Sequence, residues 1–158
     1  METAKPSVNI LGACILRDAL GLGKEFDICT VNQFIQSNSV FSVFQPPLST
    51  VTSEKILPED MSETAPVWYR WFSVNAEKNL EEKFLENKSD FVIFNLTEIQ
   101  DGLVKVENEQ GRFTYLDNSA AIKKNNLFEK EKFKDLKTTL VSAVDFAKTD
   151  KINKKLFR

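Results

Sequence analysis

A short apolar run that stops at a glycine and passes into a helical pattern opens the chain, and it restricts the fold more than any other feature. Residues 7–12 read Ser-Val-Asn-Ile-Leu-Gly and predict a strand that ends at Gly12. Residues 15–23 have the spacing of a short helix that is ended by two glycines. The apolar and β-branched residues of 26–31 predict a second strand, parallel to the first if the helix is its crossover. The opening therefore predicts an α/β fold.

The rest of the chain predicts a third strand, a hairpin and several helices. Residues 91–96, Phe-Val-Ile-Phe-Asn-Leu, give the strongest strand signal, and we expect them to be a central, parallel strand. Two apolar runs flank Asn-Glu-Gln-Gly and predict a β-hairpin at 103–116. Helical spacing predicts three shorter helices and a long C-terminal amphipathic helix, at 34–44, 77–87, 119–124 and 129–148.

These elements predict an open, mainly parallel sheet with flanking helices, to which the hairpin and the C-terminal amphipathic helix are added. A length of 158 residues suits one hydrophobic core, so we expect residues 1–158 to form a single α/β domain. Residues 151–158 are rich in lysine and arginine, and we expect them to be a flexible basic tail.

Charge and hydropathy argue against two classes of partner. The formal net charge of −2 gives no basic field that would hold a phosphate backbone, so we expect no nucleic acid. No apolar run approaches the roughly 20 residues that cross a bilayer, so we expect no membrane insertion. The N-terminal residues lack the pattern of a secretory signal, which predicts a cytoplasmic protein with Cys14 and Cys29 reduced.

The chain contains no histidine, and this absence restricts its chemistry. Histidine is the most frequent general base near neutral pH and the most frequent metal ligand. The sequence also has no glycine-rich loop that would cradle a phosphate and no dinucleotide fingerprint. We therefore expect no metal site and no cofactor.

Cys14 follows Gly12 and Ala13 at the start of the first predicted helix. The amides and the dipole of a helix N-terminus stabilise an anion, so Cys14 is a candidate nucleophile. The alternative, which we favour, is a buried thiol that packs as a small apolar group. Arg17 and Asp18 follow within the first turn, where they would line a ligand site or form an ordinary surface ion pair.

Two further groups are candidates for a site. Asn95, with Glu98 and Asp101, closes the third predicted strand, at the edge where open α/β sheets bind ligands. The two carboxylates suit acid–base chemistry, but they are equally typical of a solvated loop, which we favour. An aromatic group offers either a platform for a sugar or a partner, or ordinary core packing, which we favour. Its members are Trp68, Tyr69, Trp71 and Phe72.

Three short segments share patterns with one bacterial family. Residues 10–18 read Ile-Leu-Gly-Ala-Cys-Ile-Leu-Arg-Asp, residues 34–43 read Phe-Ile-Gln-Ser-Asn-Ser-Val-Phe-Ser-Val, and residues 90–100 read Asp-Phe-Val-Ile-Phe-Asn-Leu-Thr-Glu-Ile-Gln. They resemble the segments Gly-Ser-Cys-x-x-Arg-Asp, Tyr-x-Arg-Ser-Ser-Leu-Val-Ser and Asp-x-Leu-Ile-x-Asp-Leu-x-x-Glu-Arg of that family. The family is poorly characterised, has an SGNH-hydrolase-like (flavodoxin-like) fold and is often encoded near surface-polysaccharide genes. The resemblance covers about the first two-thirds of the chain.

The resemblance implies a site from which the chain departs in a consistent direction. It implies that Cys14 is the nucleophile of an esterase-type turn, with Arg17 and Asp18 beside it. Ala13 stands where the family has a hydroxyl residue. Amides stand where the family has charged residues at three positions, Gln36, Asn95 and Gln100. We therefore expect a shortened, degenerate relative whose fold has outlived its chemistry.

The preferred hypothesis is a non-catalytic binding or protein-interaction module built on this degenerate domain, with a link to bacterial surface polysaccharide implied by the resemblance. Its partner would be a carbohydrate or a protein. The ligand-binding residues would be Gly12, Ala13, Arg17, Asn95 and Glu98.

Two alternatives remain open. The first is an ester hydrolase or acyltransferase that acts on a carbohydrate, with Cys14 as nucleophile and Asp18 or Glu98 as base. The second is a self-associating structural protein, a homo-oligomer that uses the apolar stripe of 133–147 or Phe157 as its interface.

Overall fold

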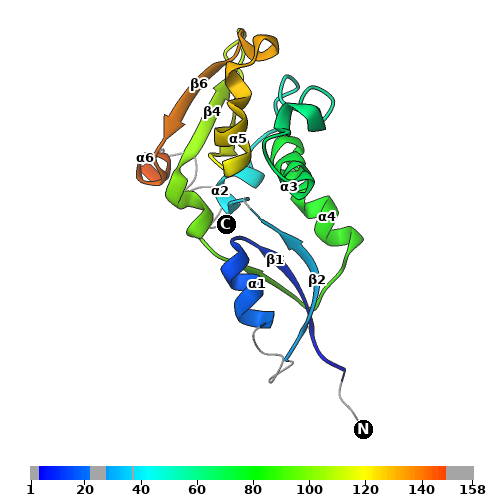
Figure 1. Cartoon of the computed structure of the whole chain (residues 1–158). Coiled ribbons are helices and arrows are strands. Elements are labelled where there is room, and N and C mark those ends of the chain that lie inside the picture. Colours follow the sequence, from blue (N-terminus) through cyan, green and yellow to red (C-terminus); the bar gives the residue numbers. More distant parts are fainter. Residues whose placement is uncertain (1–3, 22–27, 37, 149–158) are drawn as a thin grey trace.

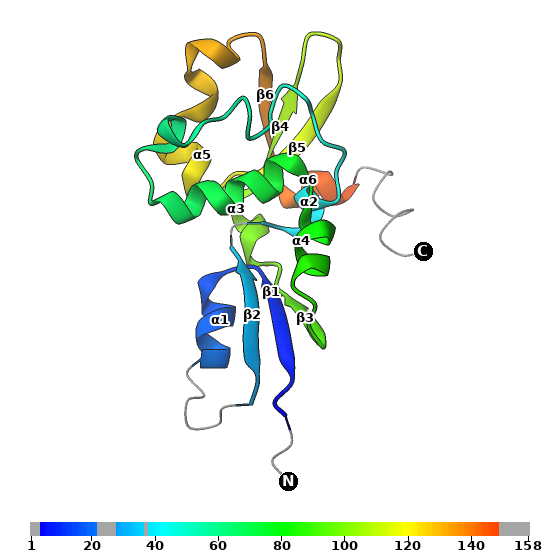
Figure 2. The same ribbon diagram turned by 90° about the vertical axis from the view of Figure 1, so that its right-hand side faces the viewer.

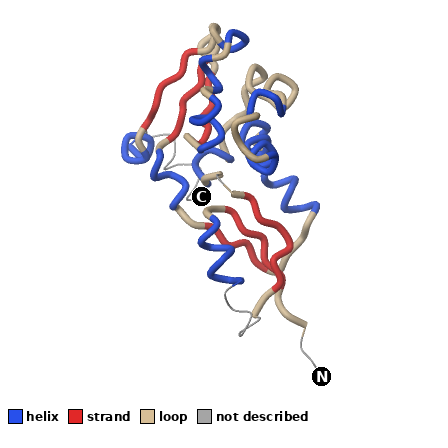
Figure 3. Tube along the Cα trace, in the orientation of Figure 1, coloured by secondary structure: helices blue, strands red, loops and turns tan. Residues whose placement is uncertain are grey.

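The computed structural model describes residues 4–21, 28–36 and 38–148. Over these residues the chain is a mixed α/β protein with two three-stranded sheets, one parallel and one antiparallel. The sheets lie towards opposite ends of the molecule, with helices between and beside them (Figures 1 and 3). The α/β class is confirmed, but the strands divide between two small sheets instead of forming one mainly parallel sheet.

The parallel sheet is formed by β1 (Ser7–Leu11), β2 (Thr30–Ile35) and β3 (Phe91–Phe94) in the order β2-β1-β3. Helix α1 (Cys14–Gly21) follows β1, as the opening of the sequence predicts. Four of the five residues of β1 are buried, because this strand has a hydrogen-bonded neighbour on each side. Figure 2 shows the three strands side by side, with α1 next to β2.

Three expectations for this region are corrected. The strand predicted at 91–96 is an outer strand, since β1 holds the central place. The strand predicted at 26–31 begins at Thr30 and runs to Ile35, while its residues 26 and 27 lie outside the described part. The helix predicted at 34–44 is reduced to α2 (Val40–Val43), whose first turn is capped by the hydroxyl of Ser39.

The antiparallel sheet is formed by β4 (Leu103–Glu107), β5 (Phe113–Asp117) and β6 (Lys137–Val141) in the order β5-β4-β6. The predicted hairpin is confirmed, since β4 and β5 pair in antiparallel register. Its turn places Gly111 at φ 72°, a conformation that glycine adopts without steric cost.

The long helix predicted at 129–148 is wrong. Two 3₁₀ turns (Leu127–Glu129 and Glu131–Phe133) come first, then β6, and only α6 (Ala143–Lys148) is helical. Two threonines and a valine within β6 favour an extended backbone, and the free side of β4 supplies partners for its amides and carbonyls. The extended preference of these residues and the backbone pairing with β4 together stabilise a strand more than the helical spacing of the apolar residues stabilises a helix.

The remaining helices are α3 (Pro66–Glu77), α4 (Leu80–Glu86) and α5 (Ala120–Asn125), with 3₁₀ turns at Pro58–Met61 and Thr97–Asp101. Helices α4 and α5 confirm the helices predicted at 77–87 and 119–124, with small shifts of their ends. The larger core includes residues of the antiparallel sheet, α3 and α5, and the smaller core joins the parallel sheet to α2, α3 and α4.

Candidate functional site

Gly12 forms the turn between β1 and α1, where the sequence places the candidate site. Its φ of +142° is strained for any residue with a side chain, and a Cβ atom there would lie 2.5 Å from Oδ1 of Asn95. Its amide donates a hydrogen bond of 3.0 Å to the carbonyl of Ile35. The glycine is thus required by the close approach of β1, β2 and the end of β3.

Asn95 connects the carboxyl ends of β1 and β3. Its Oδ1 accepts hydrogen bonds from the amides of Ala13 (3.4 Å) and Thr97 (3.3 Å), and its own amide donates to the carbonyl of Leu11 (3.3 Å). The structure therefore brings Gly12, Ala13 and Asn95 together, as the sequence predicts. The side-chain oxygen that would face a ligand is already used to hold the turn.

Cys14 is the first residue of α1, and its side chain is exposed, against the expectation of a buried thiol. Asp18 is engaged by Arg17, whose guanidinium lies 2.6 and 2.8 Å from one carboxylate oxygen. The same guanidinium stacks on the ring of Phe34, 5.1 Å from its centre. Asp18 is thus paired with a neighbour on its own helix. The side chain of Glu98 lies outside the described part.

The aromatic group of α3 packs within the protein. The indole nitrogen of Trp71 donates to the carbonyl of Phe34 at 3.2 Å, and Trp68 contacts Trp71 edge to face. Phe72 is buried, and the hydroxyl of Tyr69 donates to the carbonyl of Ser53 at 3.3 Å. These contacts agree with core packing, although Trp68, Tyr69 and Trp71 stay partly exposed.

A group of polar side chains that the sequence analysis did not single out is buried apart from the half-buried Lys78, and we call it the polar cluster: Ser39, Ser42, Asn75, Lys78 and Asp117. Asp117 ends β5 and is 4% exposed. One of its carboxylate oxygens accepts hydrogen bonds from the amide of Ser39 (2.8 Å), the hydroxyl of Ser42 and the amide side chain of Asn75. The cluster thereby joins α2 and α3 to the antiparallel sheet.

Lys78 completes the polar cluster from the C-terminal end of α3, at φ 58°. Its ammonium donates to the carbonyl of Tyr115 at 2.5 Å and to Oδ1 of Asn75 at 3.2 Å. Burial lowers the pKa of Lys78 to about 7, and the charge of Asp117 opposes this shift. Burial also raises the pKa of Asp117, against the hydrogen bonds from Ser39 and Ser42. Each charge therefore depends on the other.

The outer strand β3, which the sequence analysis predicted as a central strand, carries an exposed apolar surface. We call it the β3 surface, and it comprises Phe91 (59% exposed), Val92 (52%), Phe94 (56%) and Leu96 (51%). Neighbouring residues of a strand point to opposite faces, so both faces of β3 expose apolar side chains. A strand of this composition is normally covered on both faces.

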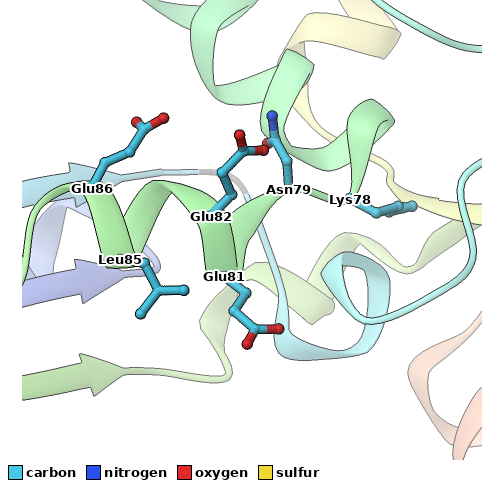
Figure 4. Close-up of a pocket in the computed structure, with 6 residues that line it drawn as sticks. All are labelled: Lys78, Asn79, Glu81, Glu82, Leu85 and Glu86. Atoms are coloured by element: carbon cyan, nitrogen blue, oxygen red, sulfur yellow. The ribbon is translucent and has the colours of Figure 1, made fainter.

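A shallow hollow of about 690 Å³ lies along α4, which leads into β3 (Figure 4). It is lined by Lys78, Asn79, Glu81, Glu82, Leu85 and Glu86. Helix α4 contains three glutamates and one lysine, so this region is acidic. Glu81 and Leu85 leave the helix on one side in Figure 4, and Glu82 and Glu86 on the other.

Comparison of the chain with protein-family models, with curated proteins and with solved structures gives no match. The resemblance to the SGNH-like family therefore stays a prediction. None of the described helices is long and apolar enough to span a bilayer. Among the described residues, no three histidine, cysteine, aspartate or glutamate side chains are grouped so that they could hold a metal ion.

Proposed function

We propose that this chain is a non-catalytic binding or protein-interaction module built on a degenerate SGNH-like domain, with the β3 surface as its contact area. The observation that carries the proposal is the exposure of apolar side chains on both faces of an outer strand. The strand order β2-β1-β3 supports it, because flavodoxin-like sheets begin in this order and continue beyond the third strand.

The geometry around Cys14 supports a non-catalytic role. A nucleophilic thiol needs a group that accepts its proton, and Asp18 is paired with Arg17. Asn95, which stands where the resembling family has an acid, holds two backbone amides instead. The turn is therefore stabilised by groups that a catalytic site would need for substrate.

A protein partner fits better than a carbohydrate. Carbohydrate sites stack sugars on open aromatic faces, and Trp68, Tyr69 and Trp71 pack against other parts of the chain. The β3 surface instead offers aliphatic and phenyl groups beside a strand edge that pairs with no other strand among the described residues. The resemblance to the SGNH-like family supports a link to bacterial surface polysaccharide, which is part of the proposal.

Esterase activity and apolar dye binding test this function together. We expect that the protein does not hydrolyse short p-nitrophenyl acyl esters. Hydrolysis that is lost in Cys14→Ala would refute the proposal. We also expect an anilinonaphthalene sulfonate dye to fluoresce on the native protein, less after Val92→Lys and equally after Cys14→Ala. A dye signal that Val92→Lys leaves unchanged would remove the β3 surface as the contact area.

The ester hydrolase or acyltransferase remains the second candidate, because Cys14 is exposed at the first position of α1. Its test is the alkylation rate of Cys14 by iodoacetamide at neutral pH. A rate no faster than that of a free thiol in a short peptide removes the physical basis for this activity.

The self-associating protein loses one of its two proposed interfaces. The apolar stripe of 133–147 is divided among a 3₁₀ turn, β6 and α6, so it does not form one helical face. The other interface, Phe157, lies outside the described residues.

A further inference from the structure

The four outer strands of the two sheets differ in how their side chains would meet another strand. Strand β2 contains Asn32 and Gln33, and β6 begins with Lys137 and continues with two threonines. Strand β5 contains Thr114 and ends at a buried aspartate. Strand β3 contains only phenylalanine, valine and isoleucine. Proteins usually protect outer strands with charges, proline, bulges or a very short length, and β3, which has four residues, contains no charge and no proline.

One long side of β3 pairs with β1, while the other has no strand partner within the described residues. An extended segment that adds to this side would satisfy backbone amides and carbonyls and cover the β3 surface at the same time. Phe91 and Val92 are neighbours in β3 and point to opposite faces, so the added segment would meet an apolar side chain on each face. Such a segment is apolar at successive positions, like a strand inside a parallel sheet.

The acidic side chains of α4 would favour a positive charge on an added segment. Helix α4 ends at Glu86, and only residues 87–90 separate it from β3. Glu81 and Glu82 are exposed in its first turn, and the one lysine of the helix is paired with Glu86. Lysine or arginine residues next to the apolar segment would therefore meet two exposed carboxylates, although Lys78 lines the hollow along α4 and Lys88 lies between α4 and β3.

We propose that the partner of this module is another polypeptide that presents an extended apolar segment flanked by lysine or arginine, and that this segment adds to the free side of β3. The inference rests on the proposed function and names the partner of the same surface. Backbone pairing along β3 provides affinity, the β3 surface selects apolar side chains, and α4 selects the basic flank.

Three labelled peptides test the proposal by fluorescence anisotropy with the full chain. The probe is Lys-Lys-Val-Ile-Val-Phe-Val, the second peptide replaces the lysines by glutamates, and the third is Lys-Lys-Val-Pro-Val-Pro-Val, which lacks two backbone donors. We expect the probe to bind about tenfold more tightly than the proline peptide. We expect it to bind about threefold more tightly than the glutamate peptide at low salt. Equal binding of the probe and the proline peptide overturns the proposal.

Two variants with matched controls locate the binding. Val92→Lys is expected to weaken the probe about tenfold, whereas Leu140→Lys on the outer strand β6 changes it less than about twofold. Glu81→Lys removes the preference for the basic flank, and Glu109→Lys in the hairpin turn keeps it. Circular dichroism and thermal unfolding confirm that Val92→Lys is folded, and Glu81→Lys remains informative if it is not. Equal losses in a variant and its control refute the site.

Light scattering separates this partner from a second copy of the chain. A wild-type dimer that Val92→Lys dissociates makes the second copy the occupant and overturns the proposal. In one outcome the peptides fail to bind while the dye still binds and no Cys14-dependent turnover is seen. That result overturns the proposed peptide partner and leaves the proposed function standing. Cys14-dependent turnover overturns the proposed function whatever the peptides do.

Discussion

Replacing Lys78 by methionine should remove a rise in stability between neutral and alkaline pH. The side chain of methionine keeps an unbranched apolar stem in the same space but has no group that titrates. In the folded protein the pKa of Lys78 is about 7, against an ordinary value of 10.5. The unfolded chain therefore binds more protons than the folded chain between these two values, so stability increases with pH in this interval.

The magnitude follows from the two pKa values. The full interval of about 3.5 units corresponds to an upper limit of roughly 5 kcal/mol at 1.36 kcal/mol per unit. Between pH 7 and pH 9 the expected rise is about 2 kcal/mol, because half of the Lys78 population is already neutral at the lower pH. Well below pH 7 both states hold the proton, and the contribution of this group no longer changes.

Urea unfolding followed by tryptophan fluorescence measures this rise, with Trp68 and Trp71 as the reporters. The free energy of unfolding of the wild type should climb relative to that of Lys78→Met from pH 7 to pH 9. Lys83→Met is the matched control, because Lys83 forms an ion pair with Glu86 on the outside of α4 and should leave the slope unchanged. Parallel pH profiles for the wild type and Lys78→Met would show that Lys78 is not desolvated in the way its burial requires.

Two further substitutions test the packing that surrounds the candidate site. Gly12→Ala forces a side chain into a φ of +142° and against Asn95, so thermal unfolding should show a loss of about 1–3 kcal/mol, and an unchanged melting temperature would contradict the tight turn. Leu116→Ala empties a fully buried position of the larger core and should cost about 2–5 kcal/mol in chemical denaturation, whereas Leu140→Ala on exposed β6 should cost far less.

Local patterns in the sequence predict the elements whose pairing is also local. The strand and helix at the opening and the hairpin at 103–116 depend on residues close together in the chain, and the structure contains them. Asn95 was placed beside Gly12 and Ala13 because the carboxyl ends of parallel strands meet at one edge of a sheet. This prediction needs only that the first and third strands are parallel neighbours.

The failures arise where distant partners decide the outcome. Residues 137–141 match helical spacing, and only the free side of β4, about thirty positions earlier, makes them a strand. Cys14 looks like a core residue by composition, but it lies at the exposed start of α1. The polar cluster has one local sign, the hydroxyl of Ser39 that caps α2, while its carboxylate comes from the end of β5.

The polar cluster has a consequence for the order in which the protein folds. Its hydrogen bond between Ser39 and Asp117 spans 78 positions and therefore closes a long loop. Because closing a long loop costs chain entropy, we expect this contact to form late in folding. The antiparallel sheet pairs over shorter separations and can form before this connection is made, whereas β1 and β3 of the parallel sheet also pair across 83 positions. Substitutions at Asp117 should accordingly accelerate unfolding and leave the refolding rate nearly unchanged in a chevron analysis.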